Sequence, residues 1–250
     1  MAGKRINRVG EKYPNNQGYK MEIIKCDGTS CCTVKFNDIK NTVVECIQFI
    51  HIREGNVRNP NHPSRYGVGY EGQGSFTYNV DRKETKCSKT FSSMLERCHS
   101  EKYQIEKPSY IGCSINNEWH NFQNFAEWYY KNYKKNWKID KDILVKGNKI
   151  YSPKTCCFVP NEINCLFTKS NRSRGSLPIG VSRKGKKFEA KVRINNIQVP
   201  LGLFYTPEEA FNVYKIAKEK EIKRIADKWK DQIEPKVYNA MYNWVVEITD

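Results

Sequence analysis

The sequence has no long apolar segment. One of its longest uninterrupted apolar runs, Cys156–Val159, spans only a few residues, whereas a membrane-spanning helix needs roughly 20. The basic residues near the start lead into no apolar stretch of the kind found in secretory signals. We therefore expect a cytoplasmic protein with no membrane partner.

The sequence also has no Cys-x-x-Cys pair, although it contains 10 cysteines. Zinc ribbons and zinc fingers usually take two ligands from such a pair, so we do not expect zinc as a cofactor. Cys98, Cys113, Cys156 and His120 have separations that match no standard zinc spacing. We expect free thiols, with buried cysteines acting as small apolar side chains.

Acidic side chains are scarce relative to basic ones. Lys plus Arg total 43 and Asp plus Glu total 27, which gives a net charge of +16. Residues 171–200 are the most cationic stretch, with Glu189 as their single acidic residue. An excess of this size favours a polyanionic partner such as a nucleic acid, and the alternative is a solvated basic surface without a ligand.

Aromatic residues make up 12% of the chain, too many for a disordered protein. The pattern predicts a multi-domain α+β protein. Residues 1–64 alternate apolar and polar side chains over Tyr19–Lys25, Thr33–Phe36 and Val43–Ile52, which indicates a small β-barrel-like accessory module. We place a central domain at residues 65–170 and a C-terminal domain at residues 171–250.

The central domain begins with a glycine-rich stretch, Gly67–Gly74, which we interpret as a hairpin or linker because no helix follows it. Helical spacing of apolar residues predicts helices over Ser88–Ser100 and Asn121–Tyr133. After Trp137 the sequence predicts two strands joined by a turn, followed by a short helix over Lys154–Phe158. This strand–strand–helix order can hold a divalent cation that polarises a phosphodiester.

Residues 88–168 contain six segments in a characteristic order: Met94–Cys98, Glu118-Trp119, Asn121-Phe122, Phe125-Ala126, Asp140–Asp142 and Tyr151–Cys156. By these segments the region resembles the phage-encoded HNH homing-endonuclease-like proteins. The resemblance implies a ββα-metal fold in which Asp140 binds Mg²⁺ or another divalent cation. Asn161 or Asn164 would supply the second protein ligand, and the location would be the host cytoplasm if the chain is phage-encoded.

The resemblance fails at one important position. The HNH family has its general-base histidine directly after the acidic residue, where this sequence has Lys141. A lysine with an ordinary pKa near 10.4 is protonated at neutral pH and accepts no proton, although its ammonium can still bind a phosphate. Asp140 and Asp142 then have an alternative interpretation as structural, solvated carboxylates.

The C-terminal domain has the clearest pattern. We expect strands over Ile179–Arg183, Lys187–Ile194 and Ile197–Phe204, with a tight turn at Asn195-Asn196. The segment Thr206–Glu209 has the form of a helix-capping box, so a long helix should follow. One face of the sheet would pack on this helix, leaving a basic face open.

Residues 176–222 resemble the AP2 DNA-binding domain. The matching residues are Gly180-Val181, Phe188, Ala190, Leu201-Gly202, Phe204, Thr206, Glu208–Ala210 and Tyr214. In that family the three-stranded sheet lies in the major groove. Carried over by position, the resemblance implies that five residues face double-stranded DNA: Arg183, Lys184, Lys187, Lys191 and Arg193.

Two functions from different classes follow from these patterns. The first is a metal-dependent, HNH-like DNA endonuclease that hydrolyses phosphodiester bonds, with Asp140, Lys141, Asn161 and Asn164 at its site. The second is a nuclease-derived DNA-binding regulator or blocker without catalytic activity, which the lysine at position 141 favours. RNA is a further partner that the same positive charge would serve.

Overall fold

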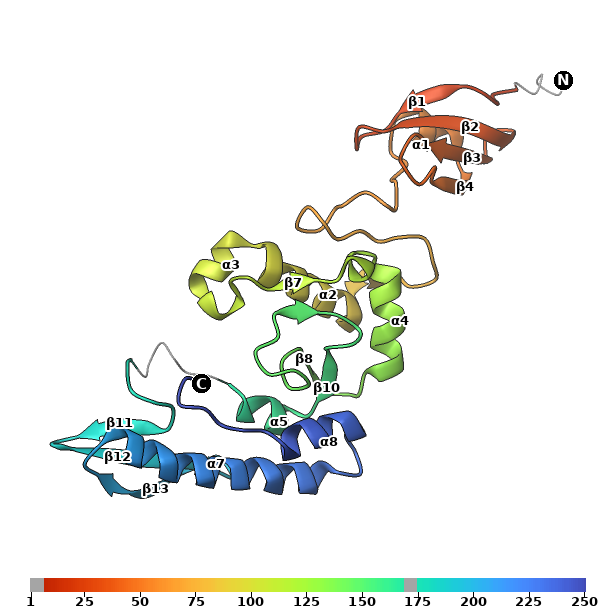
Figure 1. Cartoon of the computed structure of the whole chain (residues 1–250). Coiled ribbons are helices and arrows are strands. Elements are labelled where there is room, and N and C mark those ends of the chain that lie inside the picture. The colour runs from red at the N-terminus through yellow and green to blue at the C-terminus, as the bar shows by residue number, and fades with distance from the viewer. Residues whose placement is uncertain (1–6, 169–174) are drawn as a thin grey trace. The chain divides into compact units, whose positions relative to one another are not determined.

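The computed structural model describes residues 7–168 and 175–250 and divides the chain into two compact units, residues 1–131 and 132–250 (Figure 1). It confirms the mixed α+β class. The domain boundaries at residues 64 and 170 stay a prediction, and the second lies against residues outside the described ranges. No helix within those ranges has the length and apolar character required to cross a membrane.

The first unit begins with a four-stranded antiparallel sheet and continues into a helical part. Its elements are β1 (Lys12–Pro14), β2 (Lys20–Asp27), β3 (Cys31–Phe36), β4 (Val43–Ile47), α1 (Phe49–Arg53), β5 (Asn79–Val80), β6 (Lys83–Glu84), α2 (Lys86–His99), α3 (Glu101–Glu106), the 3₁₀ turn Pro108–Tyr110, β7 (Ser114–Ile115), the 3₁₀ turn Asn117–His120 and α4 (Phe122–Asn132).

The N-terminal sheet is open, so the predicted barrel is wrong. Its strand order is β1-β2-β3-β4, and β1 and β4 are its two edges. The expected third strand through Ile52 ends at Ile47, because the chain turns there into α1. Ile52 of this helix joins the core side chains of β2 and β3, and the helix thereby covers the apolar face that a closed barrel would have buried.

One pair of cysteines in this sheet departs from the expectation of free thiols. Cys26 of β2 and Cys32 of β3 lie directly opposite each other and are joined as a disulfide. Directly opposed residues on neighbouring antiparallel strands have adjacent Cβ atoms, so the pairing of β2 with β3 brings these two sulfur atoms together.

The glycine-rich stretch Gly67–Gly74 packs against helices. A Cβ atom at Gly69 would collide with Leu95 of α2, and one at Gly72 would collide with Asn121, which precedes α4. These glycines are therefore explained by the close approach of the backbone to its neighbours. The helices predicted over 88–100 and 121–133 are confirmed as α2 and α4.

The second unit contains a two-stranded antiparallel sheet of Lys138–Asp140 and Cys157–Val159, a small helix and a three-stranded sheet that packs on a long helix. Its elements are β8 (Lys138–Asp140), β9 (Ile150–Tyr151), β10 (Cys157–Val159), α5 (Asn161–Leu166), β11 (Val181–Lys184), β12 (Lys187–Ile194), β13 (Ile197–Phe204), α7 (Pro207–Trp229) and α8 (Pro235–Tyr242). The three strands, the capping box and the long helix predicted for residues 179–229 are confirmed.

Candidate nucleic-acid interface and carboxylate–lysine cluster

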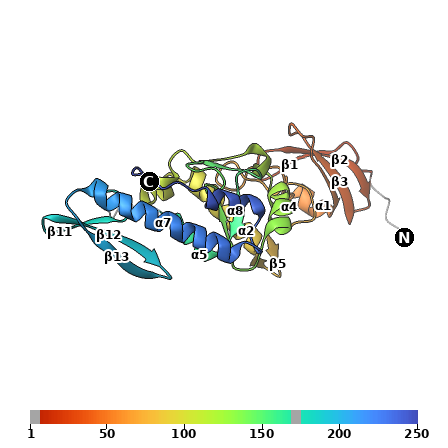
Figure 2. The same cartoon turned by 60° about the horizontal axis from the view of Figure 1, so that its bottom comes forward.

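The C-terminal sheet has one face covered by α7, which lies along it (Figures 1 and 2). Ala190 and Val192 of β12 are fully buried and pack in one core with Ala210 and Tyr214 of α7. Because side chains alternate along a strand, the residues between them point to the opposite side of the sheet. That opposite side is the open face discussed below.

The strand register decides which basic residues share the open face. Lys184 of β11 lies directly opposite Lys187 of β12, and Lys191 and Arg193 follow at alternating positions of β12. Arg183 lies opposite Phe188, whose ring packs against the core on the helix side. Directly paired residues of antiparallel strands point to the same face. Four of the five predicted residues therefore lie on the open face, and Arg183 lies on the other.

A single carboxylate lies among these cations. Glu189 forms ion pairs with Lys184 at 3.2 Å and with Lys191 at 2.6 Å. The hydrogen bond from Lys191 is the main cause that lowers the pKa of this carboxyl, and so it is ionised at neutral pH. Its charge offsets part of the positive field and orients the two lysines. Lys184 nevertheless keeps 63% of its side chain exposed to solvent.

Apolar side chains accompany the cations on the open face, a feature that the sequence patterns did not reveal. Leu203 lies opposite Glu189 and is 47% exposed, and Tyr205 beyond it is 74% exposed. The Lys187 ammonium lies 4.5 Å from the centre of the Tyr205 ring. The strict alternation of β13 is broken by a bulge opposite Ala190 and Lys191, which is why the sequence alone did not assign Leu203 to this face.

The turn between β12 and β13 is tied to α7. Asn195 and Asn196 have the positive φ angles, 48° and 64°, that a tight hairpin turn requires, as predicted. Arg224 of α7 donates to the Asn195 side chain at 2.9 Å and pairs with Glu221, also of α7, at 2.7 Å. These bonds hold the far end of the basic sheet on its helix.

The strand–strand–helix order of the central region is present, but its elements differ from those predicted. The helix expected over Lys154–Phe158 is wrong: Cys157–Val159 form β10, which pairs antiparallel with β8. The helix that follows is α5, with Pro160 at its N-cap. Proline lacks a backbone N–H and suits a helix start better than a helix interior, so the helix begins after Pro160.

Asp140 is the last residue of β8 and caps its own turn. Its Oδ1 atom accepts hydrogen bonds from the backbone N–H groups of Asp142 and Ile143, both at 2.9 Å. Burial, with a further contribution from the nearby Asp142 carboxylate, raises the pKa of Asp140 to about 6. The Asp140 side chain therefore stabilises this turn by accepting two hydrogen bonds, while burial makes its ionised form less favourable.

Lys141 is buried, with a side chain 7% exposed. Its ammonium donates to Asp142 Oδ2 at 3.0 Å and to the Asn148 carbonyl at 2.9 Å. Asn148 in turn donates to the Lys141 carbonyl at 2.7 Å, so the two residues close the loop between them. This arrangement uses the lysine as a donor that holds the loop together.

Asn161 and Asn164 lie one turn apart on α5. Asn161 is exposed at the first position of the helix, and Asn164 is half-buried, with its backbone N–H bonded to the Pro160 carbonyl at 3.0 Å. Between them, Glu162 accepts hydrogen bonds from Lys228 and from the Trp229 indole at 2.7 and 2.8 Å. These contacts attach α5 to the C-terminal end of α7.

The carboxylates of Asp140 and Asp142 already have partners within the chain. Asp140 Oδ1 is occupied by two backbone amides, and the Lys141 ammonium already neutralises the neighbouring Asp142 carboxylate. Across residues 7–168 and 175–250, no three His, Cys, Asp or Glu side chains are grouped to hold a metal ion. The metal-ligand roles of Asp140, Asn161 and Asn164 stay a prediction, and no catalytic step follows from this geometry.

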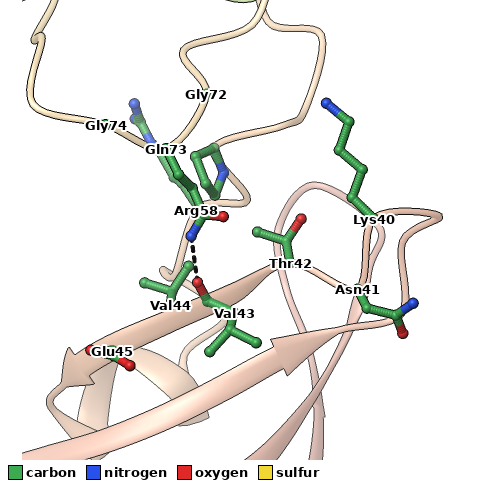
Figure 3. Close-up of a pocket in the computed structure, with 11 residues that line it drawn as sticks. Lys40, Asn41, Thr42, Val43, Val44, Glu45, Arg58, Gly72, Gln73 and Gly74 are labelled. Carbon is green, nitrogen blue, oxygen red and sulfur yellow. Dashed lines mark hydrogen bonds between the residues drawn. The ribbon is translucent and has the colours of Figure 1, made fainter. Parts of the chain in front are cut away.

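The first unit contains a hollow of about 690 Å³ beside the edge strand β4 (Figure 3). Residues 42–45 line one side, and residues 72–74 line the other, with Gln73 donating to the Val43 carbonyl at 2.6 Å. Lys40 also lines it, but its ammonium is already bonded to the Tyr70 hydroxyl at 2.9 Å. The lining also includes Thr42, whose hydroxyl donates to the Asp38 carboxylate, and the exposed Glu45.

Comparisons of the chain with known protein families, with curated proteins and with solved structures found no match.

Proposed function

We propose that this chain binds double-stranded DNA through the open face of its C-terminal sheet. The observation that carries the proposal is the gathering of Lys184, Lys187, Lys191 and Arg193 on one face of a sheet whose other face packs on α7. Lysine and arginine on such a surface neutralise backbone phosphates, and arginine also binds guanine edges in the major groove.

The neighbouring side chains suit the same ligand. Leu203 and Tyr205 are large, exposed and next to the cations, so they offer apolar contacts to base edges or sugars without a change in the fold. Glu189 keeps Lys184 and Lys191 extended across the face through its ion pairs. The face thus combines positive charge, which favours binding to phosphates, with exposed apolar side chains that can contact bases or sugars.

The salt dependence of binding tests this interface. Each lost phosphate contact should flatten the slope of log affinity against log salt by about 0.9. Replacing Lys191 and Arg193 with alanine should therefore flatten the slope by about 2, measured by fluorescence anisotropy with a labelled duplex. The matched control is Arg183→Ala, which removes a positive charge from the same sheet but from its other face.

An unchanged slope in the Lys191 and Arg193 double variant would contradict the interface, and so would an equal effect in Arg183→Ala. Competition between duplex DNA and duplex RNA of the same sequence separates the two nucleic acids. A preference for RNA would move the proposal to that partner while leaving the open face as the binding surface.

A second candidate function is the DNA endonuclease, favoured by the order β8, β10, α5. The structural role of Asp140 and the donor role of Lys141 instead support binding without cleavage, which we propose as the better description. Incubating supercoiled plasmid with Mg²⁺ or Mn²⁺ decides between them. We expect no nicking; nicking that Asp140→Asn abolishes, while DNA affinity is retained, would reverse this choice.

A further inference from the structure

Two cysteines on the outer face of the N-terminal sheet lie within bonding reach of each other. The Sγ atoms of Cys31 on β3 and Cys46 on β4 are 2.7 Å apart, and neither residue is part of the disulfide described above. Consecutive residues of a strand point to opposite faces, and Cys32, the neighbour of Cys31, is in the core. The pair Cys31–Cys46 therefore lies on the solvent side of the sheet.

A bulge in β4 brings this pair together. Cys32 pairs with Ile47 and Val34 pairs with Val44, so the two residues Glu45 and Cys46 lie opposite the single residue Thr33. Cys46 has a positive φ of 54°, which is unusual for a residue with a side chain. Such bulges redirect side chains and are frequent at sheet edges near functional sites.

We propose that Cys31 and Cys46 form a dithiol site that small-molecule disulfides oxidise reversibly to a second disulfide, which would cross-link β3 to the edge strand β4. Cys46 is exposed and Cys31 is half-buried, so Cys46 is the attacking thiol and Cys31 the resolving one. The hydrogen bond to Cys46 also raises the pKa of the Cys31 thiol.

The reaction is a thiol–disulfide exchange in two steps. The Cys46 thiolate attacks one sulfur of the oxidant, and a mixed disulfide forms as one small thiolate leaves. Cys31 then loses its proton, and its thiolate attacks the Cys46 sulfur and displaces the second small thiolate. The protein dithiol is oxidised, the small-molecule disulfide is reduced to two thiols, and the two protons pass to those products.

Tryptic peptide mapping tests the site on the full chain. Cleavage after Lys25, Lys35, Lys40 and Arg53 separates a peptide of residues 26–35, with Cys26, Cys31 and Cys32, from a peptide of residues 41–53, with Cys46 alone. The protein is fully reduced, incubated with increasing ratios of oxidised to reduced glutathione, alkylated, digested and analysed by mass spectrometry. We expect the two peptides to become cross-linked, and the link to disappear when reductant is added.

Three variants make the result specific. In Cys31→Ser the cross-link should be lost, and residues 41–53 should instead carry glutathione on Cys46. In Cys46→Ser the peptide of residues 41–53 should carry no modification at all. Cys165→Ser, which removes another exposed free cysteine, should leave the cross-link unchanged. Circular dichroism in reductant verifies that each variant is folded.

Two outcomes would overturn the proposal. The first is a wild-type protein whose residues 26–35 and 41–53 stay unlinked at every glutathione ratio. The second is a cross-link that persists in Cys31→Ser, because Cys46 would then be pairing with Cys26 or Cys32.

Discussion

At the scale of single residues, Asp140 has an observed role in its own turn, and its role as a metal ligand stays a prediction. The resemblance to the HNH family implies that Asp140 is a metal ligand, whereas the lysine that follows it departs from that family. In the structure the Asp140 oxygen caps a turn, and Lys141 bonds the loop carbonyl of Asn148. Sequence spacing identifies which residues lie at a strand end, but it does not reveal whether backbone amides already occupy a carboxylate.

The raised pKa of Asp140 predicts how the free energy of unfolding depends on pH. Between its ordinary value of 3.8 and the folded value of about 6, the unfolded chain releases a proton that the folded chain keeps. The free energy of unfolding should therefore fall as pH rises through this window, by up to about 3 kcal/mol for a shift of this size.

Asp140→Asn keeps the accepting oxygen and removes the ionisation. Relative to wild type, we expect this variant to gain stability between pH 4 and pH 7, measured by urea denaturation at both values. A stability difference that is the same at pH 4 and pH 7 would show that Asp140 ionises normally in the folded protein.

At the scale of elements, the C-terminal sheet and its helix were the most predictable part of the chain, because several independent signals agree there. Alternation along β12, two asparagines at the turn and the capping box at Thr206 all indicate the same structure. Arg183 and Lys184 are consecutive, so alternation along the strand already places them on opposite faces, and the pairing with β12 shows that Lys184 is the one on the open face. Strand register is a non-local property that one strand's pattern does not contain.

The capping box of α7 makes a prediction at this scale. Thr206 Oγ1 accepts from the Glu209 N–H at 3.2 Å, and Glu209 accepts from the Thr206 N–H at 3.3 Å. Thr206→Ala should lower the free energy of unfolding by about 1 kcal/mol, measured by chemical denaturation. Thr206→Ser, which retains the hydroxyl, is the control and should lose much less. Equal losses in both variants would mean that the methyl group, and not the cap, is responsible.

At the scale of the whole molecule, the net charge of +16 predicts a polyanionic partner before any element is assigned. Four of the cations lie on the open face of the C-terminal sheet, and the partner stays a prediction. Closure of the N-terminal module was mispredicted, because two short edge strands and a covering helix produce the same alternating pattern as a barrel. The proximity of the Cys31 and Cys46 sulfur atoms could not be predicted from the sequence either, because it depends on the bulge in β4.

The edge strand β4 has a consequence for how molecules of this protein behave toward one another. An unpaired strand edge is a template on which a strand from a second molecule can add, and such addition leads to aggregation. Here the Gln73 side chain donates a hydrogen bond to the Val43 carbonyl (Figure 3). The bulge at Glu45 and Cys46 adds one residue to the strand opposite Thr33. One glutamine amide and one extra residue thereby make this edge of the sheet a poorer template for a strand of a second molecule.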